Sequence, residues 1–138
     1  MMNYHSQILM TEIKVRFRDL DAMGHVNNAV YFTYMEIARS HFLIGLLNLT
    51  NPLKLPVIIA DASCTFKASA RFGDTIRVTV TVTRIGNKSF ELSYEMSNQE
   101  SQSIASGRTV MVTYDYINHL AMMIPEKMRK SLELYRAL

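Results

Sequence analysis

The spacing of apolar residues divides the chain into one helical part and a larger strand-forming part. From Asn28 to about Leu47, apolar side chains recur every three or four positions, which is the spacing of one helix face. Further apolar residues at Tyr31, Phe32 and Met35 widen that face. The pattern therefore predicts a long helix that is largely buried beneath another element.

Strict alternation of apolar and polar residues predicts five strands around this helix. In the first strand, Val15 and Phe17 alternate with Arg16 and Arg18. The other four strands follow the helix, and short polar turns separate them, which indicates consecutive antiparallel meanders. A short helix follows Pro125, and its apolar face consists of Met128, Leu132, Tyr135 and Leu138. The expected strands cover residues 12–18, 57–67, 76–85, 90–96 and about 103–116.

These elements predict an α+β fold with one sheet and one long apolar helix. Packing the helix on one face of an antiparallel sheet buries the apolar sides of both, and strand twist curves the sheet around the helix. A chain of 138 residues is long enough for a single domain with its own core. We expect one domain over residues 1–138, in which residues 1–10 form a loose N-terminal arm.

Composition narrows the cellular context. Hydrophobic residues make up 49% of the chain and charged residues 20%, as in an ordinary soluble globular protein. No apolar run approaches the roughly 20 residues of a membrane-spanning helix. The N-terminus also lacks the pattern of a secretory signal. We therefore expect a cytoplasmic protein with no membrane partner.

Metal, disulfide and nucleic-acid chemistry have little support in the sequence. Cys64 is the only cysteine, which excludes an intrachain disulfide. The four histidines show no metal-ligand spacing, so we expect no metal site. The net charge of +3 comes from scattered Lys and Arg residues without interleaved aromatic residues, so we expect no nucleic-acid partner.

The candidate catalytic residues concentrate between the first strand and the long helix. Asp21 precedes the helix start, where unpaired backbone N–H groups and the positive end of the helix dipole lie. Its carboxylate could act as general base or nucleophile toward a carbonyl group, or it could only cap the turn. Asp19 is the competing carboxylate, and we expect it to point the other way.

Three further residues of this turn have candidate roles. Gly24 permits a tight backbone close to a ligand. His25 could orient a reacting group or tune Asp21, or it could be a structural hydrogen-bonding residue. Asn27 or Asn28 is a suitable helix N-cap. The backbone N–H of Asn28 could also donate to a carbonyl oxygen on which negative charge develops.

Glu36 is another carboxylate, within the apolar helix itself. A buried carboxylate is costly without a partner, and Arg39 follows at the i+3 position. The two residues either form a structural ion pair, or Glu36 contributes a second carboxylate to an active site.

Several short motifs carry a family resemblance. They are Asp19-Leu-Asp-Ala-Met-Gly-His-Val-Asn-Asn-Ala-Val-Tyr31, Tyr34-Met-Glu-Ile-Ala-Arg39, Phe66-Lys-Ala-Ser-Ala-Arg-Phe-Gly-Asp74 and Arg84-Ile-Gly-Asn-Lys-Ser-Phe90. In these motifs the chain resembles the hotdog-fold acyl-CoA thioesterases of the 4-hydroxybenzoyl-CoA thioesterase type. The resemblance extends from about residue 10 to residue 117, and it specifies the superfamily but no substrate.

The resemblance implies a hotdog fold, in which a curved antiparallel sheet wraps a long central helix. It implies a homodimer or homotetramer with active sites at the dimer interface, and hydrolysis of a small to medium acyl-CoA. No cofactor is expected, since CoA is part of the substrate. Asp21 matches the catalytic carboxylate, and the backbone N–H of Asn28 matches the group that polarises the thioester carbonyl. Glu36 matches a helix carboxylate that lies near the site in some relatives. Basic residues near the pantetheine channel of relatives would bind the CoA phosphates: Lys67, Arg71, Arg84 and Lys88.

Other functions are compatible with parts of the same pattern. Plant acyl-carrier-protein thioesterases have Asn two residues after the Asp and His two residues further on. Here Met23 stands at the Asn position while His25 matches, which favours acyl-CoA. A binding or regulatory module that holds acyl-CoA would not need Asp21. A hydratase of the same fold would need a different Asp/His motif, and a purely structural oligomer would not need the polar turn.

Overall fold

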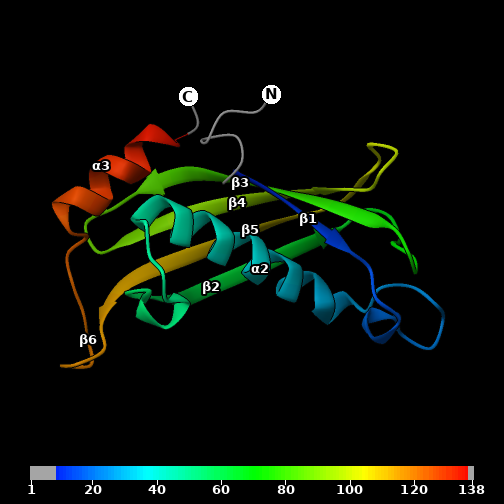
Figure 1. Ribbon diagram of the computed structural model, residues 1–138, viewed down its shortest axis with the longest axis horizontal. Coiled ribbons are helices and arrows are strands. Elements are labelled where there is room, and N and C mark those ends of the chain that lie inside the picture. The colour runs from blue at the N-terminus through cyan, green and yellow to red at the C-terminus, as the bar shows by residue number, and fades with distance from the viewer. Residues whose placement is uncertain (1–8, 137–138) are drawn as a thin grey trace.

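The computed structural model describes residues 9–136, in which two helices pack on a single sheet (Figure 1). Residues 1–8 of the expected N-terminal arm lie outside the described residues, whereas Met10 already pairs with Thr79 in a strand. The elements are β1 (Met10–Lys14), the 3-10 turn η1 (Phe17–Asp19), α2 (Asn28–Leu47), the 3-10 turn η2 (Pro52–Lys54), β2 (Val57–Phe66), β3 (Thr75–Ile85), β4 (Ser89–Ser97), β5 (Ser103–Asp115), β6 (Leu120–Ala121) and α3 (Glu126–Leu134).

The strands form one antiparallel sheet in the order β1-β3-β4-β5-β2, and the short β6 pairs with β5. The predicted meander is present in β3, β4 and β5, which are neighbours in the sheet. The prediction is wrong for β2, which pairs with β5 and lies at an edge of the sheet. Residues 67–74 carry the chain from that edge to β3, and this pairing depends on contacts between distant residues that local alternation does not encode.

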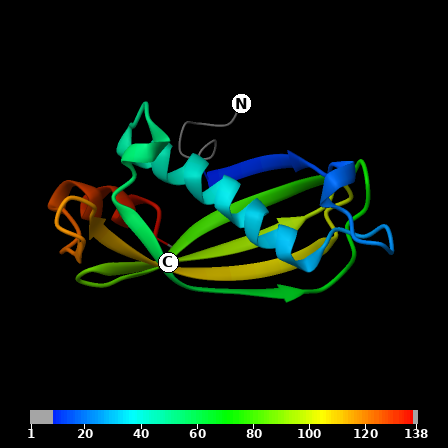
Figure 2. The ribbon, with the colours of Figure 1, turned by 90° about the horizontal axis from the view of Figure 1, so that it is seen from below.

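The core lies between α2 and one face of the curved sheet (Figure 2). Alternate side chains of β3 and β4 face α2 and are fully buried, as the alternation predicts. At the centre of β5, Gly107 lies directly beneath the helix, and a Cβ atom there would overlap the sulfur of Met35. The absence of a side chain at Gly107 therefore lets α2 pack closely on the sheet.

The bounds predicted for the long helix are confirmed, but its predicted burial is only half right. Asn27 caps the helix by accepting a hydrogen bond from the backbone N–H of Ala29. One face is buried against the sheet, while Phe32 and Ile37 on the other face are 38% and 42% exposed. A single sheet can cover only one side of a helix, so half of the apolar stripe faces outward in the isolated chain.

The predicted first strand over residues 12–18 is also too long. β1 ends at Lys14, and the chain turns through η1, in which Phe17 is 79% exposed. The cause is Asp19, whose carboxylate accepts hydrogen bonds from the backbone N–H and the guanidinium of Arg16 and so favours a turn over an extended strand.

The C-terminal helix α3 completes the core at one end of the sheet, where it packs against α2 and β3. Met128 and Leu132 are buried on its inner face, as the sequence predicts, and Tyr135 makes an edge-to-face contact with Phe42 of α2. The predicted contribution of Leu138 lies outside the described residues. None of the described helices is long and apolar enough to cross a membrane.

Candidate active site

Asp21 lies in a tight turn that its own side chain holds together. Its Oδ1 atom accepts hydrogen bonds from the backbone N–H groups of Met23 and His25, at 2.9 and 3.2 Å. The backbone of Asp21 and His25 is bridged as well, and Gly24 between them has φ of 80°, which suits glycine. Oδ2 of Asp21 has no hydrogen bond within residues 9–136. The capping role and a free carboxylate oxygen therefore coexist in one side chain.

The start of α2 presents an unpaired donor beside this turn. The side-chain oxygen of Asn27 accepts a hydrogen bond from the backbone N–H of Ala29. Its backbone carbonyl accepts one from the N–H of Val30. The N–H of Asn28 finds no acceptor in the part of the chain that the structure describes. This donor stands at the positive end of a helix that continues to Leu47.

Asp21, His25 and Asn28 line one pocket of about 340 Å³. The ring of Tyr31 packs edge-to-face on Phe66 of β2 in the same pocket, with centroids 5.3 Å apart. The pocket thus combines a carboxylate, an exposed helix end and aromatic surface. Its remaining lining residues are Met23, Val26, Lys67, Ala68 and Ser69.

Asp19 faces away from this pocket, as expected, but strand alternation is not the cause. Alternation places residues two positions apart on the same face, and β1 already ends at Lys14, so Asp19 lies in the turn η1. It is 2% exposed, and its carboxylate accepts hydrogen bonds from Arg16 and from the Tyr34 hydroxyl at 2.9 Å. Burial by itself would raise the pKa of the Asp19 carboxyl, but these hydrogen bonds outweigh burial and hold the pKa below its ordinary value. Asp19 is therefore an ionised structural residue, and burial together with Asp19 raises the pKa of Tyr34.

His25 lies between the pocket and the segment that joins β2 to β3. Its ring Nδ1 is 3.4 Å from the hydroxyl of Ser69, and its backbone forms an isolated bridge with Arg71. The ring is half-buried and lines the pocket, so a role in orienting substrate stays a prediction.

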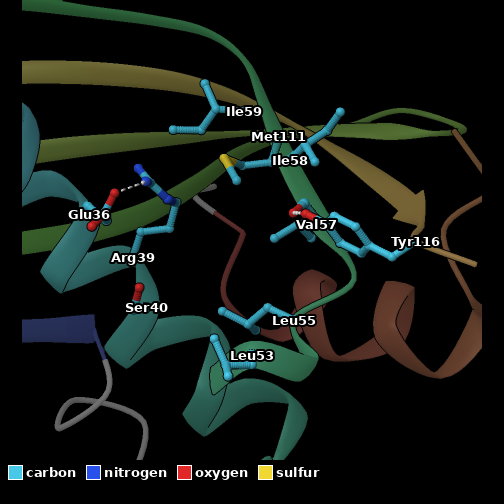
Figure 3. A pocket seen from close by; sticks show the side chains of 10 residues that line it. All are labelled: Glu36, Arg39, Ser40, Leu53, Leu55, Val57, Ile58, Ile59, Met111 and Tyr116. Atoms are coloured by element: carbon cyan, nitrogen blue, oxygen red, sulfur yellow. Dashed lines mark hydrogen bonds and ion pairs between the residues drawn. The ribbon is translucent and has the colours of Figure 1, made fainter. Parts of the chain in front are cut away.

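Glu36 lies in a different pocket from Asp21. This second pocket, of about 550 Å³, lies between the middle of α2, the first residues of β2 and the loop before β2 (Figure 3). Glu36 pairs with Arg39 at 3.9 Å, which is the expected i+3 ion pair. On β2, Ile59 lines the Glu36 pocket and Phe66 lines the Asp21 pocket. About 23 Å of extended strand separates the two residues. Glu36 therefore cannot act together with Asp21 of the same chain on one small acyl group.

The four basic residues expected to bind CoA phosphates are not gathered in one place. Lys67 lines the Asp21 pocket and pairs with Glu95 at 4.0 Å. Arg71 is exposed next to His25, its bridge partner. Arg84 and Lys88 lie at the β3–β4 hairpin. Arg84 is about 30 Å of extended strand from Thr75, the end of β3 nearer the Asp21 pocket.

The structure gives no support to nucleophilic chemistry at Cys64 or to metal binding by the described residues. Burial raises the pKa of the Cys64 thiol, which keeps it protonated rather than nucleophilic. Among the described residues, no three His, Cys, Asp or Glu side chains are grouped so that they could hold a metal ion.

The second pocket was not anticipated from the sequence. Its apolar walls come from Leu53, Leu55, Ile59 and Met111, which alternation identifies only as core or loop residues. One signal was available: Arg39 falls on the same helix stripe as Met35 and Phe42, where a charged residue is unusual.

Comparison with known proteins places these features in a family. A model of the thioesterase-like superfamily matches residues 15–132. Among characterised sequences, the long-chain acyl-CoA thioesterase FadM of Escherichia coli is 27% identical over 131 residues, which cover 91% of this chain and 97% of FadM.

Solved structures agree with the sequence comparison. A thioesterase from Thermus thermophilus, in complex with coenzyme A and zinc, is 28% identical, with a TM-score of 0.85 over 95% of this chain and 97% of that chain. A predicted thioesterase from Bacillus stearothermophilus has a TM-score of 0.87 at 22% identity, over 94% and 96% of the two chains. The α+β architecture expected from the sequence is confirmed as the hotdog fold of such thioesterases.

Proposed function

Because the chain belongs to the thioesterase-like superfamily, we propose that it hydrolyses small to medium acyl-CoA thioesters to the free acid and CoA. FadM, which aligns with nearly the whole chain, is an acyl-CoA thioesterase, and the T. thermophilus thioesterase was solved with coenzyme A. The observation that carries the proposal is the pocket of about 340 Å³ at the start of α2, which Asp21 and Asn28 line together.

In the proposed mechanism, the thioester carbonyl oxygen accepts a hydrogen bond from the backbone N–H of Asn28. Negative charge develops on this oxygen during attack, and the positive end of the α2 dipole stabilises that charge. Because the donor is part of a rigid helix capped by Asn27, it needs no reorganisation when the charge forms. The CoA thiolate then leaves readily.

Asp21 supplies the attacking group in one of two ways. It attacks the carbonyl carbon to form an acyl-enzyme anhydride, which water hydrolyses, or it takes a proton from a water molecule that attacks directly. Both routes consume one water molecule and release the acid and CoA. The free Oδ2 atom of Asp21 supports either role, since Oδ1 is occupied by the turn.

The decisive substitution is Asp21→Asn. Asparagine keeps an Oδ1 atom that can accept from Met23 and His25, so the turn is retained while the negative charge is lost. We expect kcat to fall by at least about a hundredfold on a panel of short, medium, long and aromatic acyl-CoAs. Circular dichroism and thermal melting of both proteins check that folding is unchanged.

Asp21→Ala separates the structural role from the chemical one. It should lose activity as Asp21→Asn does and also lower the melting temperature, because two turn hydrogen bonds are removed. If Asp21→Asn retains wild-type kcat, Asp21 is only a capping residue and the proposed mechanism is wrong.

Two alternatives give different results in the same assay. A binding or regulatory module would bind acyl-CoA in a calorimetric titration yet hydrolyse no member of the panel. An acyl-carrier-protein thioesterase would show a higher kcat/KM for an acyl group on the carrier protein than on CoA.

We also propose that the active molecule is a homodimer, or a tetramer built from such dimers. Within residues 9–136, no strand pairs with the outer side of the edge strand β2, along which Ile59 and Phe66 are 45% and 42% exposed. The exposed face of α2 adds Phe32 and Ile37. Pairing two copies along β2 would satisfy the free backbone groups and cover these side chains.

The remaining expectations concern CoA and location. We propose Lys67 as the basic residue closest to the bound thioester, since it lines the Asp21 pocket. Alanine substitution tests whether the CoA phosphates are bound by Arg71, Arg84 and Lys88. Replacing a residue that binds them should raise KM and leave kcat little changed. A cytoplasmic location is tested by cell fractionation.

A further inference from the structure

A third pocket lies at the end of α2 that is far from the Asp21 turn. It encloses about 330 Å³ between the last turn of α2, the loop before β2 and the start of α3. α3 packs beside this end of α2 (Figure 1). About 28 Å of helix separates Asn28 from Leu47 at the helical rise of roughly 1.5 Å per residue. The third pocket is therefore remote from the candidate active site of the same chain.

The loop before β2 also separates the third pocket from the second one. Leu53 and Leu55 line the second pocket, whereas Lys54 and Pro56 line the third. Among the described residues, the two pockets have no lining residue in common. The third pocket is thus a space of its own, and it needs its own explanation.

The floor of the third pocket is aliphatic. α2 ends beside it because Asn48 adopts the left-handed conformation, with φ of 54°, and its backbone N–H closes the last helical turn. The chain then turns away through η2, and α3 later contributes the opposite wall. The floor consists of half-buried Leu46, Leu47, Leu49 and Pro56 together with buried Met128.

Two lysines from different elements give the rim of this pocket a positive charge. Lys54 of η2 and Lys127 of α3 both line the pocket and are exposed. Within residues 9–136, neither lysine forms an ion pair with a carboxylate. No acidic residue lines the pocket, since Glu126 next to Lys127 lies outside it. The charge of both ammonium groups is therefore available to a ligand.

An aliphatic floor below a cationic rim favours an amphiphilic anion. Burying a hydrocarbon chain on the floor removes apolar surface from water, and a carboxylate at the rim can accept charge-assisted hydrogen bonds from both lysines. The volume of about 330 Å³ lies at the lower end of the range for small-molecule pockets, which suits one chain rather than a two-chain lipid.

We propose that the third pocket binds a medium-chain aliphatic carboxylate. The head group lies between Lys54 and Lys127, and the chain lies on the floor between α2 and α3. The free acids that the proposed reaction releases belong to this class of ligand. The inference does not rest on that reaction, because it concerns binding at a site away from Asp21.

The test follows octanoate binding to the 138-residue chain by nuclear magnetic resonance of isotope-labelled methionine methyl groups. Each pocket has its own reporter: Met128 lines the third pocket, Met23 the Asp21 pocket and Met111 the second pocket. Replacing each of these methionines by leucine, one at a time, assigns the three signals. The Met128 signal should shift with added octanoate and reach saturation.

Two further ligands separate the contributions of head group and chain. Octyltrimethylammonium has the same chain with a positive head group, so its Kd at Met128 should be about tenfold or more above that of octanoate. Acetate has the carboxylate without the chain. It should leave the Met128 signal unshifted at the concentration at which octanoate saturates, because it buries almost no apolar surface.

Substitution of the two lysines tests the rim. Lys54→Gln and Lys127→Gln should each raise the Kd for octanoate about threefold, and the double variant about tenfold, as expected for exposed ion pairs that act independently. Lys127→Arg keeps the charge and should keep the affinity. Lys130→Gln removes a lysine of α3 that does not line the pocket, and it is the matched control. Thermal melting checks that folding is unchanged.

Several outcomes would overturn the inference. They are an unshifted Met128 signal, octanoate shifts confined to Met23 or Met111, equal Kd values for the two octyl amphiphiles, and a double lysine variant with the wild-type Kd. The proposed thioesterase function is judged separately, by hydrolysis of acyl-CoAs. A protein that hydrolyses no acyl-CoA but binds octanoate at Met128 as described would refute that function and leave this inference intact.

Discussion

At the residue scale, Asp19 and Asp21 lie on either side of Leu20 but have different surroundings. Asp19 is enclosed by Arg16 and Tyr34, whereas Asp21 keeps one carboxylate oxygen free at a pocket. A carboxylate whose two oxygens both accept hydrogen bonds from protein donors contributes stability, and one with a free oxygen can react. The surroundings rather than the residue type therefore distinguish the two roles.

The lowered pKa of Asp19 predicts a specific dependence of stability on pH. In the unfolded chain the carboxyl titrates near its ordinary value of 3.8, and in the folded protein it titrates lower. The folded protein therefore gains stability from ionised Asp19 above the unfolded pKa, and it loses this contribution as pH falls through the folded pKa.

Tyr34→Phe tests this dependence. Removing the hydroxyl deletes a hydrogen bond to a buried carboxylate, so we expect the free energy of unfolding at neutral pH to fall by about 1–3 kcal/mol. The difference from wild type should shrink as Asp19 becomes protonated in acid. Urea denaturation across this pH range measures it.

Tyr94→Phe is the matched control for Tyr34→Phe. Tyr94 is also fully buried, but its hydroxyl forms hydrogen bonds with the hydroxyl of Thr109 and the guanidinium of Arg39 rather than with a carboxylate. The decrease in the free energy of unfolding caused by Tyr94→Phe should therefore stay constant over the same pH range. A constant difference for Tyr34→Phe would contradict the role assigned to Asp19.

At the element scale, the packing of α2 on the sheet depends on one missing side chain. Gly107 on β5 lies under Met35, and a Cβ atom there would also come within 3.1 Å of the carbonyl oxygen of Ser63. The helix that carries Asn28 is thus positioned partly by a residue in the middle of a strand, far away in the sequence.

Gly107→Ala should therefore destabilise the protein by about 1–3 kcal/mol, because the new methyl group displaces the Met35 side chain from a filled core. Chemical denaturation of the variant measures this cost. In a Met35→Ala background the sulfur is absent, so Gly107→Ala should cost clearly less. Equal costs in the two backgrounds would show that Met35 is not the group displaced.

At the scale of the whole molecule, the described part of a single chain leaves the edge strand β2 and half of the long helix α2 uncovered. Ala62 lies in the middle of β2, is exposed, and faces the same side of the sheet as the core, opposite Thr109. A charge that points inward from an edge strand is a common obstacle to edge pairing. This position is therefore suited to testing the proposed dimer.

Ala62→Glu should convert the dimer into a monomer in analytical ultracentrifugation. Because the family resemblance implies an active site at the dimer interface, thioesterase activity should fall together with the dimer fraction. Thr79→Glu, on the outer face of β3, adds the same charge away from the interface and should leave both assembly and activity unchanged. A dimeric Ala62→Glu protein would contradict pairing through β2.

What the sequence by itself determined is the set of local elements. The bounds of α2 and the buried positions of β3 and β4 follow from periodicity, because a helix or strand repeats its side-chain direction over neighbouring residues. The polar turn at Asp21 and Asn28 was also visible, since glycine and asparagine interrupt both periodicities there. The pocket that gathers these two residues agrees with that choice, while their catalytic roles stay predictions.

The tertiary structure decided how these elements meet. The pairing of β2 with β5 and the separation of Glu36 from Asp21 both depend on contacts between residues far apart in the chain. The burial of Arg39 depends on such contacts as well, since the sequence predicts only its ion pair with Glu36. Local patterns encode which face of an element is apolar, but the partner that covers this face is chosen by packing the whole chain.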